Sequence, residues 1–236
     1  MNLLLLEPQE LDSESRAVIR GRRARHIQQI LRAEPEDSLK AGVIGGSVGL
    51  AHLQYIKSDE VHLRYEPKHE PPGAARVKLV LALPRPKVLR RVLAGIASLG
   101  VKEIYLINSF RVEKPYWSST QVSAEYIRRS CLLGLEQAGD TILPDVRLER
   151  LFKPFVEDRL PEVIRGTEAF VAHPGGKYSA PGGMNGPMTL AIGPEGGFIP
   201  YETELLQSVG FTAVNLGQRI LKFETAIAFL LGRILV

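Results

Sequence analysis

From residue 77 onward, short apolar runs alternate with stretches in which apolar residues recur at helical spacing. The runs are bounded by glycine or polar residues and predict strands at 77–83, 103–107, 168–172, 189–192 and 213–216. The amphipathic stretches predict helices at 87–99, 124–137, 201–208 and 223–234. This alternation predicts an α/β domain built on a mainly parallel sheet.

The first part of the chain has a different pattern. Short apolar or alternating pieces at 38–40, 49–55 and 60–65 are separated by glycines and polar turns, which favours a small β-barrel. Helical spacing at 24–31 predicts one helix before these strands. The segment 66–75 is rich in proline, glycine and charge, as in a linker. We therefore expect a barrel domain at 1–72 and an α/β domain at 73–236.

Two of the predicted strands end abruptly in glycine. Residues 189–192 run into Gly193-Pro-Glu-Gly-Gly, and residues 213–216 run into Gly217. Glycine permits positive φ and lets a ligand approach the main chain without a Cβ in the way. Two such turns, each leading into a helix, predict one ligand pocket built mostly from backbone. The chain contains neither a dinucleotide-binding glycine motif nor a complete phosphate loop.

Composition narrows the class of protein. The 236 residues are 44% hydrophobic, and no apolar run approaches the ~20 residues that span a bilayer. Cys131 is the only cysteine, and the five histidines have no ligand-like spacing. We expect a cytoplasmic protein with no secretory leader, no membrane partner and no metal.

The net charge of +4 is unevenly distributed. A stretch without any acidic residue contains six arginines: Arg16, Arg20, Arg22, Arg23, Arg25 and Arg32. This cluster is either an ordinary solvated face or a surface that contacts phosphates, because clustered guanidiniums neutralise phosphates and release counterions.

The two glycine turns carry a resemblance to a known family. Residues 192–198 (Ile-Gly-Pro-Glu-Gly-Gly-Phe) and 216–226 (Leu-Gly-Gln-Arg-Ile-Leu-Lys-Phe-Glu-Thr-Ala) closely resemble the joint signature of SPOUT-superfamily methyltransferases. These enzymes modify N3 of a uridine in bacterial small-subunit ribosomal RNA. The resemblance implies a PUA-like RNA-binding barrel followed by a SPOUT domain with a mainly parallel sheet and a trefoil knot. It also implies S-adenosylmethionine (SAM) as cofactor, small-subunit ribosomal RNA as substrate, and a homodimer that pairs across the last helix.

The resemblance also implies roles for individual residues. The implied cofactor-binding residues are His173, Pro174, Ile192, Gly193, Glu195, Gly196, Gly197, Leu216, Gly217, Ile220, Leu221 and Thr225. Arg219 and Arg111 are the catalytic candidates, because a cation near the base stabilises charge that spreads onto the ring carbonyls when N3 loses its proton. The alternative is that Arg219 pairs with Glu224 or Glu195 and only holds the loops. The implied RNA-binding residues are Arg22, Arg23, Arg25, His26, Arg32 and Lys222; the alternative for His26 is a helix-surface residue without RNA contact.

The sequence departs from the family pattern at several points. Ile199 replaces a helix-capping serine, and Lys222 replaces an arginine. Two further family arginines are absent, with Asp140 and Ile142 in their places, and Ala94, Gly95 and Ser98 replace a polar motif. Two alternatives to uridine N3 methylation therefore stay open: the same chemistry on a different RNA, or a non-catalytic RNA-binding or ribosome-assembly factor on the same fold. For the apolar last helix, 223–236, the alternative to pairing is burial within its own domain.

Overall fold

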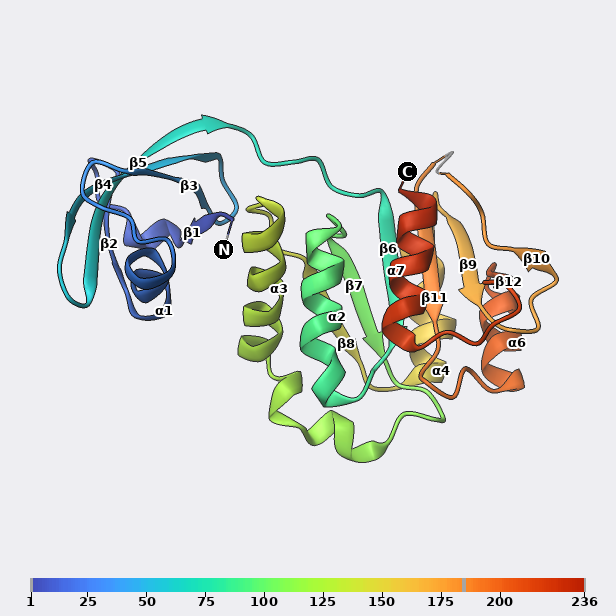
Figure 1. Ribbon diagram of the computed structural model, residues 1–236. Helices are drawn as coiled ribbons and strands as arrows, with labels where there is room; N and C mark the ends of the chain where they lie inside the picture. Colours follow the sequence, from blue (N-terminus) through green and yellow to red (C-terminus); the bar gives the residue numbers. More distant parts are fainter. Residues whose placement is uncertain (1, 184–185, 236) are drawn as a thin grey trace. The chain divides into compact units, whose positions relative to one another are not determined.

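The computed structural model describes residues 2–183 and 186–235 (Figure 1). The chain forms two compact units. The first comprises Met1–Gly73 and Cys131–Leu143, and the second comprises Ala74–Ser130 and Pro144–Val236. The first unit is therefore discontinuous in sequence. The single domain boundary expected between residues 72 and 73 does not include its second segment.

A five-stranded sheet with the order β1-β3-β4-β5-β2 forms the first unit. Its strands are β1 (Leu4–Leu6), β2 (Arg16–Arg20), β3 (Ser38–Val43), β4 (Val48–Ile56) and β5 (Glu60–His69). β1 and β3 are parallel and the other pairs antiparallel. Alternate residues such as Ile19, Leu53 and Leu63 are buried on one face, as expected of strands with one solvated face. The helical elements are η1 (Pro8–Glu10), α1 (Gly21–Arg25) and the π-helical turn η2 (His26–Ile30).

The segment Cys131–Leu143 is held to the N-terminal strands by main-chain bonds. The carbonyl oxygen of Glu136 accepts hydrogen bonds from the N–H groups of Asn2 and Leu3, both at 3.0 Å. Gly45 N–H donates to the Thr141 carbonyl oxygen at 2.9 Å, and the Thr141 hydroxyl donates to the carbonyl oxygen of Gly46. These contacts explain why this segment belongs to the first unit.

The second unit contains a seven-stranded, all-parallel sheet with the order β10-β12-β9-β11-β6-β7-β8. Its strands are β6 (Val77–Ala82), β7 (Glu103–Ile107), β8 (Asp145–Glu149), β9 (Glu168–Ala172), β10 (Tyr178–Ser179), β11 (Met188–Ile192) and β12 (Thr212–Asn215). β11 lies at the centre, between β9 and β6, and all five of its residues are buried. Its continuous apolar run is typical of a strand covered on both faces.

Helices connect these strands, and α2 packs against α7 (Figure 1). The α-helices are α2 (Pro86–Ser98), α3 (Ala124–Ala138), α4 (Phe152–Pro154), α5 (Leu160–Val163), α6 (Pro200–Ser208) and α7 (Phe223–Ile234). Short turns η3 (Lys114–Ser118), η4 (Thr120–Val122) and η5 (Phe155–Arg159) complete the unit. α2 ends before Gly100, whose φ of +80° is the left-handed conformation that glycine favours.

The predicted α/β class is confirmed: a mainly antiparallel five-stranded sheet is followed by an α/β domain with an all-parallel sheet. Because β6, β7, β9, β11 and β12 run in the same direction, their carboxyl ends lie along one edge of the sheet. In open α/β sheets, ligands bind outside this edge.

Candidate active site

A cleft of about 460 Å³ lies at the carboxyl ends of β9, β11 and β12. This volume is within the range of about 300–1,000 Å³ that is usual for small-molecule sites. The cleft is lined by Arg111, Ala172, His173, Pro174, Ile192, Gly193, Pro194, Glu195, Gly196, Gly197, Phe198, Leu216, Gly217, Gln218, Arg219, Ile220, Leu221, Phe223 and Ala226. The structure thus brings together eleven of the twelve proposed cofactor residues and both proposed catalytic arginines.

The turn that follows β11 requires glycine for steric reasons. A Cβ on Gly193 would lie 2.7 Å from the backbone nitrogen of Phe198, which is closer than real contacts allow. Gly197 has a φ of +73°, and its N–H donates to the carbonyl oxygen of Pro194 at 2.7 Å. The turn therefore folds tightly back on itself and leaves main-chain groups facing the cleft.

Asn215 joins the other two loops of the cleft to each other. Its side-chain amide donates to the Gly176 carbonyl oxygen at 2.9 Å, and its side-chain oxygen accepts from Gly217 N–H at 3.3 Å. A Cβ on Gly176 would lie 2.5 Å from the carbonyl carbon of Val214, so the two loops are in direct contact. In the loop after β9, the Nδ1 atom of His173 accepts from Gly175 N–H at 3.0 Å. His173 therefore shapes its own turn.

Arg111 reaches the glycine turn from the loop after β7. Its guanidinium donates a hydrogen bond to the carbonyl oxygen of Gly196. A Cβ on Gly196 would lie 2.9 Å from the Cδ atom of Arg111, so the arginine side chain packs here because position 196 is glycine. This places a cation directly on the wall of the cleft.

Glu202 is a functional residue that the sequence did not reveal. Its carboxylate is only 3% exposed, and each oxygen accepts a different backbone N–H. Oε1 bonds Phe110 N–H at 2.6 Å, and Oε2 bonds Ile199 N–H at 3.0 Å. Ile199, at the N-cap position of α6, has no side-chain acceptor. The Glu202 side chain, three residues later, instead accepts a hydrogen bond from the Ile199 backbone N–H. Glu202 thereby joins the loop after β7 to the loop after β11.

Arg219 pairs with neither of the carboxylates proposed as alternatives. The nearest cation to Glu195 is Arg85, at 3.7 Å, and Glu224 pairs with Arg91 at 3.2 Å. Within the described part of the chain, Arg219 makes no ion pair or hydrogen bond and is exposed while lining the cleft. Its guanidinium is therefore available to a ligand.

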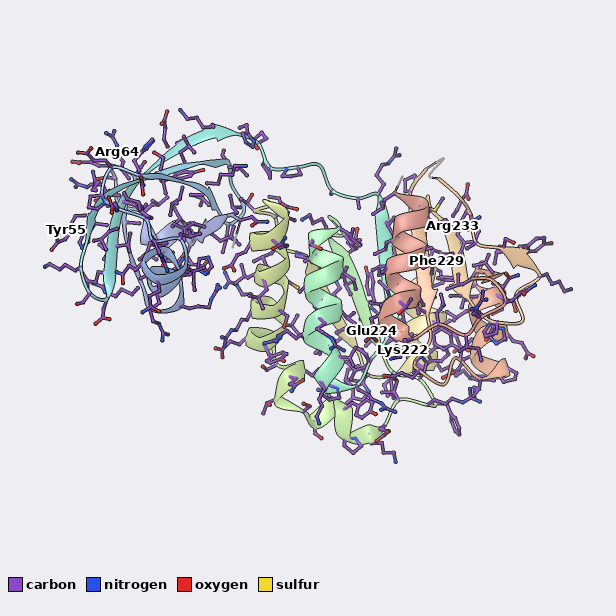
Figure 2. The ribbon with its side chains drawn as sticks, in the orientation of Figure 1. Tyr55, Arg64, Lys222, Glu224, Phe229 and Arg233 are labelled. Atoms are coloured by element: carbon purple, nitrogen blue, oxygen red, sulfur yellow. The ribbon has the colours of Figure 1, made fainter. Side chains whose placement is uncertain are left out.

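Two proposed site residues of the second unit, Thr225 and Lys222, lie outside the cleft lining. Thr225 is exposed on the first turn of α7, and Lys222 is the exposed residue that precedes this helix (Figure 2). The interior-facing residues of α7 are buried in its own unit: Phe223, Ala226, Ile227, Leu230, Leu231 and Ile234. Val236, included in the sequence-based helix, lies outside the described residues.

The structure divides the arginine cluster of the first unit into paired and unpaired side chains. Arg22 binds both carboxylate oxygens of Glu136, and Arg23 binds Glu10 and the Leu5 carbonyl oxygen. Arg16 pairs with Asp12 and Glu14, and Arg20 pairs with Glu60. Arg25 and Arg32 are exposed and have no ion pair or hydrogen bond to other described residues.

His26 is half-buried next to this cluster. Its Nε2 atom is buried without a hydrogen-bond partner among the described residues. Burial, together with the nearby charge of Arg22, lowers the pKa of the imidazole. The imidazole of His26 is therefore harder to protonate than an exposed one.

The cleft fits SAM by its chemistry. Gly193, Gly196 and Gly217 line the cleft with main chain, which suits the polar edge of an adenine, while Ile192, Leu221 and Phe223 supply apolar wall. At Gly193 a Cβ would collide with the backbone of Phe198, so only glycine allows this tight turn beside the cleft. Charge and main-chain groups are thus arranged around a space of suitable size.

The parallel sheet and the cleft of glycine turns at its carboxyl end agree with the SPOUT-type fold that the sequence resembles. The chain belongs to the family described as the RNA methyltransferase domain, whose model matches residues 71–235. It is 29% identical over 238 residues to ribosomal RNA small subunit methyltransferase E of Treponema pallidum, covering 96% of this chain and 87% of that protein. It is 23% identical to the E 1 enzyme of Borreliella burgdorferi, covering 96% and 94%.

A solved structure shares the fold. Ribosomal RNA small subunit methyltransferase E of Neisseria gonorrhoeae, bound to SAM, matches with a TM-score of 0.71 at 21% identity, covering 97% of this chain and 95% of that chain. The family predicted from the glycine turns is therefore confirmed.

No helix in residues 2–183 and 186–235 is long and apolar enough to cross a membrane. Over the same residues, no group of three or more His, Cys, Asp or Glu side chains is placed to hold a metal ion.

Proposed function

We propose that this protein transfers a methyl group from SAM to N3 of a uridine in small-subunit ribosomal RNA. The observation that carries the proposal is the convergence of Arg111 and the unpaired Arg219 on one cleft made from glycine turns. The relatives named as ribosomal RNA small subunit methyltransferases support the choice of RNA. SAM supplies a methyl group on a sulfonium, which is already a good leaving group, so the protein mainly aligns donor and acceptor.

The residues of the cleft have different roles in this proposal. The turns at 173–176, 193–197 and 216–221 hold the cofactor through main-chain groups. Loss of the N3 proton to water would leave negative charge spread over N3 and the two ring carbonyls. The N3–methyl bond would then form as the bond between the methyl carbon and the SAM sulfur breaks. Arg219 is free to stabilise that charge, whereas Arg111 is fixed against Gly196 and positions the base. The N3 edge takes part in base pairing, so the uridine is unpaired or extruded before transfer.

The first unit binds the RNA in this proposal. The barrel domain, 1–72, binds the RNA backbone, and the domain 73–236 performs the transfer in the cytoplasm. Arg25 and Arg32 are the members of the arginine cluster whose guanidiniums have no carboxylate partner among the described residues, so they carry the phosphate contacts. Arg22 and Arg23 hold the unit together around these two, and Lys222 adds charge beside the cleft.

We also propose a two-fold homodimer that pairs across α7. After the inward face of this helix is buried, an exposed stripe remains at helical spacing: Thr225, Ala228, Phe229 and Gly232. Phe229 is 41% exposed, and Figure 2 shows it along α7 between Glu224 and Arg233. Small residues around one aromatic ring allow a second helix to approach closely. An isologous contact of this kind is the commonest way for a soluble chain to form an oligomer.

Methyl transfer tests the proposal directly. Small ribosomal subunits that lack the modification, and their free RNA, are incubated with the protein and labelled SAM. The modified nucleotide is then mapped by mass spectrometry. We expect one N3-methyluridine, and Arg219→Ala should slow transfer about 100-fold or more while RNA binding persists. Methylation at another nucleotide would indicate a different target, and absence of any transfer would refute the enzymatic function.

A further inference from the structure

Phe110 presents an aromatic ring to solvent beside the cleft. It lies in the loop after β7, directly before Arg111, and its side chain is 78% exposed. Arg111 lines the cleft and bonds the Gly196 carbonyl oxygen. The ring therefore projects from the chain next to a residue whose side chain is fixed on the cleft wall.

The backbone that carries this ring is anchored at several points. Asn108 N–H donates to the Glu149 carbonyl oxygen at 2.9 Å, and the Asn108 side-chain oxygen accepts from Trp117 Nε1 at 3.0 Å. Phe110 N–H donates to the buried Glu202 carboxylate at 2.6 Å. Val112 is buried and bonds back to Ser109. A loop held in this way fixes the backbone position from which the ring projects.

Glu202 also ties this loop to the cofactor turn. Its second oxygen accepts from Ile199 N–H, two residues after Gly197 in the turn that follows β11. The position of Phe110 is therefore set relative to the cleft through one buried carboxylate. Pre-organisation of this kind reduces the ordering cost of binding.

The surroundings of the ring indicate what it binds. Ile220 lines the cleft and is 88% exposed, so it is an exposed apolar side chain of this site in addition to Phe110. The guanidiniums of Arg111 and Arg219 lie on the same cleft. A flat aromatic ring combined with cations suits an unpaired nucleobase, since the base stacks on the ring and its backbone phosphates face the positive charges.

We propose that Phe110 is a stacking platform for an unpaired nucleobase of the RNA at the mouth of the cleft. This role rests on the proposed function for the RNA as substrate, and it makes Phe110 an RNA-binding residue of the same site. The ring binds through its π-face, so an aromatic residue fulfils the role and an aliphatic side chain of similar size does not. A single exposed apolar residue is common on protein surfaces; the anchored backbone and the adjoining cleft distinguish Phe110.

The test compares Phe110→Ala, Phe110→Leu and Phe110→Tyr with the wild type. A fluorescein-labelled, uridine-containing single-stranded oligoribonucleotide is titrated in the presence of SAM, and its anisotropy gives the dissociation constant. We expect the Ala and Leu variants to bind about tenfold more weakly and the Tyr variant to bind like wild type. Tyr178→Ala removes another exposed aromatic ring, 64% exposed on β10, and serves as the matched control without effect.

Three further readings separate the possible failures. SAM affinity by calorimetry should be unchanged, which shows that each variant is folded. Equal oligonucleotide affinity of Phe110→Ala and wild type, or no binding by wild type, overturns the proposal. A change of oligomeric state in Phe110→Ala by light scattering also overturns it, because the ring would then lie between two copies. If the wild type transfers no methyl group, the proposed enzymatic function is refuted. If the Ala and Leu variants nevertheless lose oligonucleotide binding, the stacking role of Phe110 is still supported.

Discussion

The guanidinium of Arg23 is bonded to the carboxylate of Glu10 within the first unit. The same arginine donates to the carbonyl oxygen of Leu5 at 2.7 Å, so it ties the turn η1 to strand β1. This arginine was predicted from sequence to contact RNA, but the pair gives it a structural role. The finding changes which variants should affect stability and which should affect binding.

Glu10→Gln should destabilise the protein at neutral pH. Burial opposes ionisation of Glu10, but the bonds from Arg23 and from Glu7 N–H outweigh it and hold the pKa of Glu10 below its usual value. The ionised pair therefore stabilises the folded state above the unfolded pKa of ~4.3, and this contribution disappears as the pH falls through the folded value. We expect a loss of about 1–2 kcal/mol in the free energy of unfolding at pH 7, which shrinks as the pH falls through the folded value, measured by urea denaturation.

The matched control for this variant is Glu14→Gln. Glu14 pairs with Arg16 at 2.8 Å, but both side chains are exposed to solvent. Exposed pairs contribute about 0–1 kcal/mol, so this variant should unfold like wild type. Equal destabilisation by both substitutions would contradict a specific role for the Arg23–Glu10 pair.

Gly193→Ala should abolish SAM binding, with a smaller effect from Gly196→Ala. The new Cβ at position 193 meets backbone atoms of Phe198 and Gly197, which cannot move without opening the turn, whereas at position 196 it meets the flexible side chain of Arg111. Gly196→Val, which is bulkier, should also abolish binding while the domain stays folded. Calorimetry with SAM measures all three, and Gly95→Ala on α2, where a Cβ meets no described atom within 4 Å, is the control. Wild-type affinity in folded Gly193→Ala would place the site elsewhere.

Much of the sheet could be predicted because its central strands are short, continuous apolar runs. The predicted strands at 103–107 and 168–172 have the observed bounds. Those for β6 and β11 differ by one residue at one end, and that for β12 is shifted by one residue. β8 was missed because it is an edge strand in which charged and apolar residues alternate after a proline, and β10 has only two residues. The segment 131–143 could not be assigned to the first unit, since its bonds to Leu3 and Gly45 join residues far apart in sequence.

The cleft was accessible to sequence analysis where its residues form consecutive motifs. The turns at 193–197 and 216–221 each contain several lining residues next to one another, so their glycines were conspicuous. Glu202 and Phe110 gave no such signal, because the bond between them joins positions 92 residues apart. The pairing of Arg22 and Arg23 was hidden for the same reason, since Glu10 and Glu136 lie outside the acid-free stretch that made the arginines appear free.

Phe229→Glu should convert the proposed homodimer into a monomer. The ring is partly exposed on the outer stripe of α7, where a charge would be desolvated and unpaired in a two-helix contact. Light scattering at micromolar concentration measures the change, and Arg233→Glu, at the last turn of the same helix, alters charge without removing the ring. A wild-type monomer, or a dimer that persists in Phe229→Glu, would contradict pairing through this face.

Arg25→Ala and Arg32→Ala should weaken RNA binding without affecting stability, because neither guanidinium has a partner among the described residues. Each phosphate contact that is lost should reduce the slope of log affinity against log salt by about one unit. The slope is measured from RNA titrations between about 50 and 200 mM salt, with SAM affinity expected to stay constant. Arg22→Ala is the informative contrast: it breaks the bidentate pair with the buried Glu136 carboxylate, so it should lower the free energy of unfolding by about 1–3 kcal/mol and leave the salt slope unchanged. If Arg22→Ala instead reduces the slope as much as Arg25→Ala does, RNA displaces Glu136 from Arg22, and the paired arginines belong to the binding surface after all.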